Sequence, residues 1–552
     1  MKRSLILALA AALACEAPSG APAGSGGPSA ADAIRGGEIQ EYLKTLSSDE
    51  FGGRGPGQAG GDLASQYVAD HFREFGLAPV DGGYFQNVPM IGTTSIPGSV
   101  ALSFEVPNGR VAPIYLDDFV LNAGDPEGAP VDVSGEMVFV GYGIDAPEHR
   151  WNDFAGMDMA GKILLILVND PPAPPDEPDL FGGRAMTYYG RWTYKYEEAA
   201  RQGALGALII HETEPAGYPW SVVRGGWSGE QFALPPDPSG PAPVPFLGWV
   251  SHDAAARALA LADFDLSELE GEAAQRGFTP VPTGITAHAT VRSTVRRVET
   301  RNVVGLLKGS ERPDEVVTLT SHYDHFGIGE PIDGDSIYNG AYDNASGTAL
   351  LMTMAHAFAE MDRAPARSLM FISTAAEEQG LLGSEWYVQS PLLPLDHTVA
   401  EINLDGANLW GETDDVIVFG AERSELGAFV KRRAAEMKLV VMPDAEPEKG
   451  FFFRSDHFPF ARAGVPSLYV EHGREFRGRP EGWGQQIMDD YTAHRYHAPS
   501  DEYSEDFVYD GAVQQGRLIF LTALDIANDD TWPNWFEGGE FKAARDRMMK
   551  GR

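Results

Sequence analysis

The stretch SLMFISTAAEEQG, residues 368–380, joins an apolar run to a pair of adjacent glutamates. The run from Leu369 to Ile372 is short and free of Gly and Pro, which is typical of a strand buried on both faces of a sheet. Glu377 and Glu378 follow it, and adjacent carboxylates repel each other. Either both glutamates lie in water at a loop tip, or a positive group holds them.

Apolar runs and helical patterns alternate on both sides of this stretch, from about residue 296 onward. The runs are NVVGLLKG (302–309), VVTLTSH (316–322), VAEINLD (399–405), DVIVFG (415–420) and PSLYVEH (466–472). Helical patterns cover ASGTALLMTMAHAFAEM (345–361), residues 424–437 and residues 511–527. This alternation predicts an α/β domain with a mixed, mostly parallel sheet flanked by helices.

Side chains that can bind metals follow several of these predicted strands. In open α/β sheets, ligands bind beyond the carboxyl ends of the strands. One further acid precedes the helix at 345–361, and one histidine lies in the loop YHAPSDE (496–502). The candidate metal ligands gathered in this way are His322, Asp343, Glu378, Asp405 and His497.

A mixture of imidazole and carboxylate groups without cysteine suits zinc, with Co²⁺ or Mn²⁺ as possible substitutes. A carboxylate has two oxygens and can span two metals, so one aspartate is expected to bridge a pair of ions. Two dications would balance three carboxylates and one hydroxide, whereas one dication would leave the site strongly negative. We therefore predict two Zn²⁺ ions.

The two glutamates are predicted to divide their roles. If the segment is extended, successive side chains face opposite ways, so Glu378 can be a ligand while Glu377 stays free of metal. Glu377 would then take a proton from a water bound to the metal and deliver it to a leaving amine. This arrangement predicts metal-assisted hydrolysis.

Five segments in this order resemble family M28 of the metallopeptidases, which contains zinc aminopeptidases and glutamate carboxypeptidases. They are SHYDHFG (321–327), GAYDNASG (340–347), AAEEQGLLGS (375–384), INLDG (402–406) and YHAPSDE (496–502). The resemblance implies that His322, Asp343 and Asp405 surround one zinc, that Asp343, Glu378 and His497 surround the other, and that Glu377 is the general base. It also implies a cis peptide bond after Asp343. Many relatives have an acid where this chain has Tyr342, a position that is not a ligand.

The resemblance also sets the expected domain organisation. Residues 130–285, which contain YYGRWTYKYEEAARQGALGALIIHE (188–212), look like the smaller, β-rich α/β protease-associated domain that is often inserted in these enzymes. Residues 36–129 would form the N-terminal part of the peptidase domain, and residues 286–552 its main part. This insert is either a strand and helix module that packs on the catalytic face or a lid, whose long loop at residues 214–245, with Trp220 and Trp227, narrows access to the metals.

The N-terminus predicts export. MKRSLILALAAALAC begins with positive residues and continues with a short apolar stretch, as in a signal peptide, and residues up to 35 form a flexible tether. Cys15, the only cysteine, stands where a bacterial lipoprotein signal has its lipidated residue. The alternatives are a lipid-anchored protein, periplasmic or on the outer membrane, and a secreted protein cleaved after Ala14.

The net charge of the chain restricts the classes of molecule that it can bind. The chain has 42 Lys and Arg against 80 Asp and Glu, a net charge of −38, which disfavours nucleic acid as a partner. The expected substrate is a peptide, and the leading function is an aminopeptidase that releases N-terminal residues. A carboxypeptidase, a glutaminyl cyclase of similar fold and a metal-free binding module stay open as alternatives, and the sequence does not indicate an oligomeric state.

Overall fold

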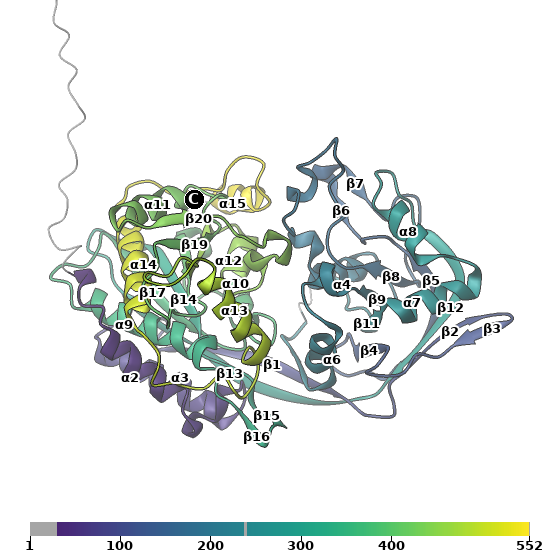
Figure 1. The fold of residues 1–552 in the computed structure, drawn as a ribbon, viewed down its shortest axis with the longest axis horizontal. Helices are drawn as coiled ribbons and strands as arrows, with labels where there is room; N and C mark the ends of the chain where they lie inside the picture. The colour runs from purple at the N-terminus through teal and green to yellow at the C-terminus, as the bar shows by residue number, and fades with distance from the viewer. Residues whose placement is uncertain (1–29, 237–239, 551–552) are drawn as a thin grey trace, which may run out of the picture.

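The computed structural model describes residues 30–236 and 240–550, which form two lobes (Figure 1). The large lobe is built on a nine-stranded sheet and the small lobe on an eight-stranded sheet. Each sheet is flanked by helices, so both lobes are α/β. No helix among the described residues has the length and hydropathy needed to cross a membrane.

The sheet of the large lobe is mixed: its central pairs and the edge pair β19–β20 are parallel, and the other pairs are antiparallel. The pairs β17–β14, β14–β18 and β18–β21 are parallel, whereas β1–β13, β13–β17 and β19–β21 are antiparallel. Every residue of β17 is buried, as its apolar run predicts. The strand order is β10 (Gln231–Ala233), β1 (Phe85–Ser95), β13 (Ser293–Leu307), β17 (Arg367–Thr374), β14 (Arg312–His322), β18 (Thr398–Asn403), β21 (Ser467–His472), β19 (Asp415–Phe419) and β20 (Val440–Met442).

Helices cover this sheet, and the main core lies between them and the strands. Helix α2 buries Ile39, Tyr42, Leu43 and Leu46, the periodic apolar positions of its sequence. In α9 and α14 the rings of Phe358 and Phe520 stack with centroids 3.8 Å apart. The helices are α2 (Gly36–Leu46), α3 (Ala59–Glu74), α9 (Gly347–Ala359), α10 (Leu382–Gln389), α11 (Leu426–Glu436), α12 (His457–Ala463), α13 (Trp483–His494), α14 (Asp510–Asn528) and α15 (Lys542–Met549).

The small lobe has a parallel centre of its own, formed by β5, β8, β9 and β11. Its strand order is β3 (Gly109–Val111), β2 (Ala101–Val106), β12 (Val281–Val291), β5 (Val131–Phe139), β8 (Ile163–Leu167), β9 (Gly206–His211), β11 (Phe246–Ser251) and β4 (Phe119–Ala123). Its helices are α4 (Trp192–Arg201), α5 (Thr213–Ala216), α6 (Trp220–Ser228), α7 (His252–Leu259) and α8 (Leu266–Ala273). A short hairpin in this lobe pairs β6 (Asp145–Ala146) with β7 (Trp151–Asn152). A second hairpin, β15 (Gly327–Ile332) with β16 (Asp335–Tyr338), packs on the turn Asp49–Arg54 of the large lobe.

The small lobe is larger than the predicted range of 130–285. Strands β2, β3 and β4, between Ala101 and Ala123, belong to its sheet, and β12 continues to Val291. The composition does not change at residue 100, and only the long-range pairings of β2 with β12 and of β4 with β11 bring these strands into the small lobe. The predicted signal peptide and most of the tether, residues 1–29 with Cys15, lie outside the described residues.

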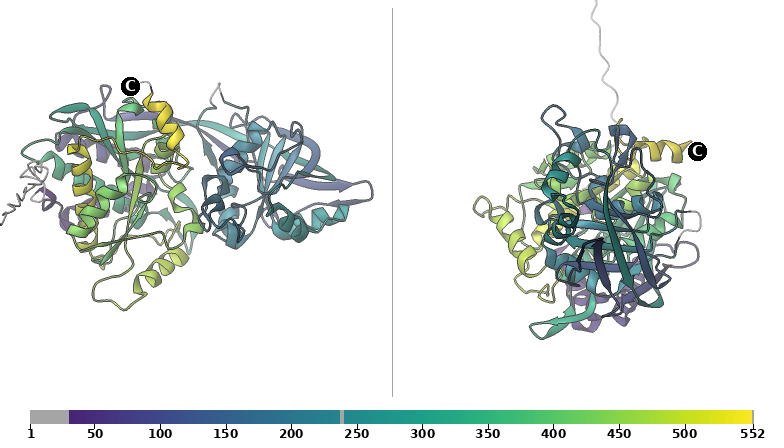
Figure 2. Two further views of the ribbon diagram at one scale, coloured as in Figure 1. Left: turned by 90° about the horizontal axis from the view of Figure 1, so that it is seen from above. Right: turned by 90° about the vertical axis from the view of Figure 1, so that its right-hand side faces the viewer.

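The long antiparallel pair of β1 and β13 connects the two lobes (Figures 1 and 2). The lobes also touch through side chains. The ring centroid of Tyr188 lies 5.0 Å from that of Phe458, and Arg462 Nη1 lies 3.2 Å from Glu197 Oε1.

The segment 214–245 is not the long loop that we expected. It contains α5, α6 and β10, and β10 pairs with β1 of the large sheet. Trp220 donates a 3.0 Å hydrogen bond to the carbonyl of Leu116, and the ring of Trp227 lies 5.7 Å from that of Tyr196. Because both tryptophans pack inside the small lobe, they are not available as a flexible lid.

Candidate metal centre

The predicted site residues gather at the carboxyl edge of the parallel strands. His322 ends β14, the two glutamates follow β17, and Asp405 follows β18. Asp343 lies in the helical turn Ala341–Ser346 before α9, and His497 lies in the loop after α13. The structure therefore brings together all five predicted ligands and Glu377.

Asp343 stands between the two histidines. Its Oδ1 lies 3.4 Å from His322 Nε2, and its Oδ2 lies 3.4 Å from His497 Nε2. The two oxygens of this one carboxylate therefore face two different imidazoles, which is the arrangement that a bridging ligand requires. The Asp343–Asn344 peptide bond is cis, as the resemblance predicts.

Each histidine has a second carboxylate at similar distance. His322 Nε2 lies 3.2 Å from Asp405 Oδ1, and His497 Nε2 lies 3.2 Å from Glu378 Oε2. Ligand atoms of His322, Asp343 and Glu378 all lie within 4.8 Å of one another, and so do those of His322, Glu377 and Asp405. The donors thus form two groups that share His322, and Asp343 belongs to one of them.

The two glutamates point to different groups, although not for the predicted reason. Residues 375–380 form a turn rather than an extended segment, and the amides of Gly380 and Leu381 donate to the carbonyl of Glu377. Glu378 faces the histidines, whereas Glu377 Oε2 lies 3.8 Å from His322 Nε2. Burial raises the pKa of Glu377 well above its ordinary value, His322 opposes this, and the nearby Asp405 and Glu378 raise it further.

Residues without a predicted role position these donors. His325 Nδ1 lies 2.5 Å from Glu378 Oε1. The carbonyl of Asp324 lies 3.3 Å from His322 Nδ1, and its carboxylate accepts the amide of Glu377 at 3.1 Å. The carbonyl of Asp324 is closer to His322 Nδ1 than its carboxylate is, since Oδ1 of the carboxylate lies 3.8 Å away.

Asp501 and Arg54 hold the loop that carries Asp343. Asp501 accepts the amides of Tyr342 and Asp343 at 3.1 Å each. Arg54 is fully buried and donates to the carbonyls of Leu46, Tyr323, Asn339 and Gly340. Burial lowers the pKa of Arg54 to about 10. Asp501 is four positions after His497 in YHAPSDE, a spacing that could have suggested it, whereas the surroundings of Arg54 give no comparable signal.

Tyr342 lies outside the donor set. Its hydroxyl lies 3.3 Å from His472 Nε2, and its ring packs against those of Trp410 and Tyr491. The substitution of an acid by Tyr342 therefore removes no donor from the site.

The chemistry of the donor set fits zinc. It offers two imidazoles and three carboxylates in a mostly buried site, and such mixed nitrogen and oxygen donors suit zinc. The carboxylates face histidines, and no Lys or Arg within residues 30–236 and 240–550 forms an ion pair with them, so bound cations would find a negatively charged set of donors here.

Comparison with known proteins places this site in a family. The profile of Peptidase family M28 matches residues 302–522. A probable zinc metalloprotease of Pyricularia oryzae is 38% identical over 109 residues, which is 20% of each chain. The aminopeptidase YwaD of Bacillus subtilis is 27% identical over 237 residues, 42% of this chain and 46% of that one. The chain covers about a fifth of the length of the first curated relatives.

The fold has a counterpart among solved structures. An aminopeptidase from Aneurinibacillus sp. strain AM-1 matches with a TM-score of 0.50 and 19% identity, over 90% of this chain and 95% of that one. This similarity supports the α/β fold of both lobes. Residues 302–522, which carry every predicted ligand and both glutamates, match the model of Peptidase family M28.

Proposed function

We propose that this protein is a zinc-dependent exopeptidase that uses two metal ions and releases N-terminal residues from peptides. The observation that carries the proposal is the position of Asp343, whose two oxygens each lie 3.4 Å from a different histidine. In this proposal His322, Asp343 and Asp405 hold one zinc, and Asp343, Glu378 and His497 hold the other.

Zinc bound here would polarise the carbonyl of the scissile bond and acidify the attacking water. The chain supplies the proton transfer. Glu377 is beside His322 but 0.6 Å farther from its Nε2 than Asp405 is, 3.8 Å against 3.2 Å, so Asp405 is the better ligand and Glu377 the better base. The carboxylate of Glu377 takes the proton of the attacking water and passes it to the nitrogen of the leaving amine.

The test measures metal and turnover together. The purified chain is expected to hold two zinc equivalents at this centre and to release chromophore from aminoacyl anilides, and a chelator is expected to abolish both. One equivalent with cyclisation of N-terminal glutamine would support the glutaminyl cyclase alternative instead. Full zinc occupancy without turnover of any peptide would support a binding module.

A carboxypeptidase is the second candidate, because two arginines lie where the lobes meet. Arg454 Nε and Nη2 are buried without a hydrogen-bond partner among the described residues. Arg454 follows Phe453, whose ring contacts Tyr188, and Arg191 is three residues beyond Tyr188 in the small lobe. Burial and the neighbouring Arg454 lower the pKa of Arg191 to about 10. Two facing guanidiniums suit a carboxylate, which peptides carry at the C-terminus.

Tyr496 lies between these arginines and the donor set. Tyr496 lies close enough to affect the pKa of both guanidiniums, and its ring stacks on His497 with centroids 3.7 Å apart. Peptides blocked at either end separate the two candidates. An aminopeptidase loses its activity when the amine is acetylated, whereas a carboxypeptidase loses it when the carboxyl group is amidated. Arg454→Gln is expected to raise KM only for substrates whose carboxylate reaches the arginines.

Export and the nature of the small lobe are part of the same proposal. We propose that residues 1–14 direct the chain out of the cytoplasm and that Cys15 becomes the lipid anchor of a bacterial lipoprotein, while the small lobe corresponds to the protease-associated domain. Labelling with radioactive palmitate would distinguish the anchor, because the Cys15→Ala variant keeps no label if Cys15 is lipidated. A wild-type chain that stays unlabelled and is secreted would leave plain secretion as the explanation.

A further inference from the structure

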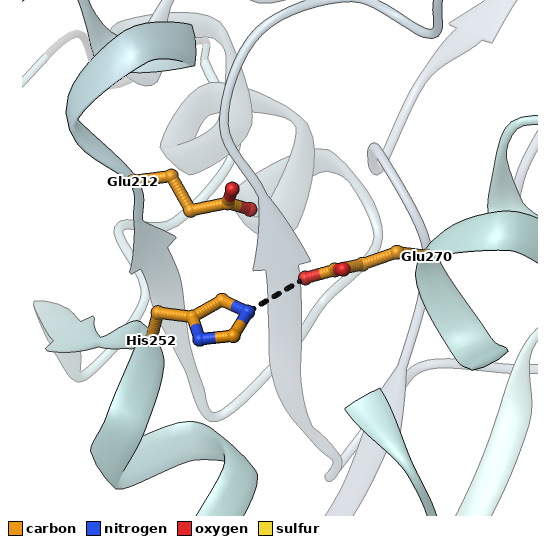
Figure 3. Close-up of side chains that lie close together, drawn as sticks. All are labelled: Glu212, His252 and Glu270. Carbon is orange, nitrogen blue, oxygen red and sulfur yellow. Dashed lines mark hydrogen bonds and ion pairs between the residues drawn. The ribbon is translucent and has the colours of Figure 1, made fainter. Parts of the chain in front are cut away.

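A second cluster of possible metal ligands lies in the small lobe, in a part of the fold that the proposed catalytic site does not use. Glu212 follows β9, and His252 begins α7 directly after β11 (Figure 3). Strands β9 and β11 are parallel neighbours, and His211 pairs with Ser251 at their ends. Glu270 approaches the same place from α8. Three separate elements therefore bring one side chain each to the carboxyl edge of this sheet.

The three side chains are close enough to share one ion. One ligand atom from each lies within 4.8 Å of the other two, and His252 Nε2 lies 3.1 Å from Glu270 Oε1. Figure 3 shows the carboxylate of Glu212 pointing into the space beside the other two side chains. A point between these three groups is within binding distance of all of them after small side-chain movements, since zinc lies about 2.0–2.2 Å from such donors.

Charge at this cluster is not balanced by the protein. Neither glutamate forms an ion pair with a Lys or Arg in the described part of the chain, and the partner of Glu270 is His252. Burial raises the pKa of Glu212, the negative charge of Glu270 raises it further, and the nearby His252 and His211 oppose this.

The cluster is also accessible. A cavity of about 570 Å³ opens beside it and is lined by His211, Glu212, Ser251 and His252, among others. Glu212, His252 and Glu270 are only partly buried. An ion can therefore enter from solvent and keep water molecules as its remaining ligands.

From these observations we propose that Glu212, His252 and Glu270 bind a divalent transition metal ion, and that zinc is the ion that suits them best. One imidazole and two carboxylates form a mixed nitrogen and oxygen site with three protein ligands, which zinc completes with water. The ion ties α8 to the ends of β9 and β11 and so fastens the helical face of the small lobe. This site is separate from the proposed catalytic centre and does not require that centre to bind metal.

The first experiment measures metal content in the full chain. The Glu212→Gln and His252→Asn variants are expected to bind one zinc equivalent fewer than the wild type, with turnover of anilides unchanged. His288→Asn is the matched control, because His288 pairs with a single carboxylate, that of Asp132, at 2.9 Å in the same lobe. Equal zinc content in the wild type and both cluster variants would overturn the proposal.

The second experiment needs no variant and so does not depend on how the variants fold. Diethyl pyrocarbonate modifies accessible histidines, and peptide mass spectrometry gives the rate at each position. With free zinc at ten times its Kd the site is about 90% occupied, so modification of His252 is expected to slow about tenfold while His288 is unaffected. Equal rates at His252 with and without zinc would contradict the proposal, whatever happens at His322 and His497.

Discussion

At the scale of single residues, the two adjacent glutamates differ because their surroundings differ. Glu378 lies between two imidazoles, those of His325 and His497, whereas Glu377 has one imidazole at 3.8 Å. We expect Glu377→Gln to keep both zinc ions and to lower kcat by about 10³-fold, since a general base typically contributes 10²–10⁴-fold. Glu378→Gln is expected to lose metal as well as activity. Metal analysis beside kinetics separates the two, and loss of zinc in Glu377→Gln would mean that the roles are exchanged.

Replacement of Arg54 is expected to lower the stability of the folded chain. Its guanidinium satisfies four carbonyls of the loops that carry the site, and apolar replacement leaves those buried carbonyls without donors. Arg54→Met is expected to lower the free energy of unfolding by about 3 kcal/mol, the range found when one partner of a buried polar group is removed. Urea unfolding of the metal-free chain measures this change in the free energy of unfolding. Arg110→Met, at an exposed ion pair, is the control with an expected change below about 0.5 kcal/mol.

His457 is expected to make the free energy of unfolding depend on pH. It is fully buried against the ring of Phe452, and burial lowers its pKa to about 3. Because the pKa is lower in the folded chain, His457 binds its proton more readily in the unfolded chain. The contribution of neutral His457 to the free energy of unfolding is therefore complete above pH 6.5 and is lost as the pH falls toward 3. His457→Phe is expected to remove about 1.4 kcal/mol per pH unit from the slope between pH 6 and 4. An unchanged slope for the variant, measured by urea unfolding with chelator present, would contradict this.

At the scale of elements, apolar periodicity decided what could be predicted. Strand β17 and helix α9 are buried almost throughout, so their sequences alone indicate them. Helix α13 buries only Gly484 and Tyr491, and α6 contains two glycines, which disfavour a helix, so the sequence did not indicate either of them. The positions of His322, Asp405 and the two glutamates were predictable because strand ends limit where such side chains can lie. Arg54 and His325 were not, because their roles depend on tertiary contacts that no spacing reveals.

The short helical turn Tyr188–Gly190 holds the small lobe against the large one. Tyr188 packs on Phe453 and Phe458, and its hydroxyl accepts from Arg462 at 3.2 Å. Tyr188→Ala removes these contacts, and aromatic pairs contribute about 0.5–1.5 kcal/mol each. We expect faster hydrogen exchange in residues 447–463 with unchanged zinc content. Tyr115→Ala, at a ring pair within the small lobe, is the control that should leave this segment unchanged.

At the scale of the whole molecule, the order of the sheets was less predictable than the strands. The centre of the large sheet is parallel as expected, but the side that contains β1 and β13 is antiparallel because these two strands form a long ribbon that also connects the lobes. Such pairing joins residues 85–95 to residues 293–303, and no local pattern signals a contact over that distance. The same long-range pairing explains why the small lobe begins at Ala101 and not at residue 130.

The charge of the whole chain predicts how salt affects substrate capture. With a net charge of −38, the protein attracts cationic peptides and repels anionic ones over the Debye length, which is about 30 Å at 0.01 M salt and about 8 Å at 0.15 M. Between these concentrations, kcat/KM is expected to fall about threefold for a lysyl anilide and to rise about threefold for an aspartyl anilide. An alanyl anilide corrects for general salt effects. Parallel changes of kcat/KM for all three substrates would mean that the net charge does not act at the site. A fall of kcat/KM for the aspartyl anilide at higher salt would mean that local attraction by Arg191 and Arg454 exceeds the long-range repulsion.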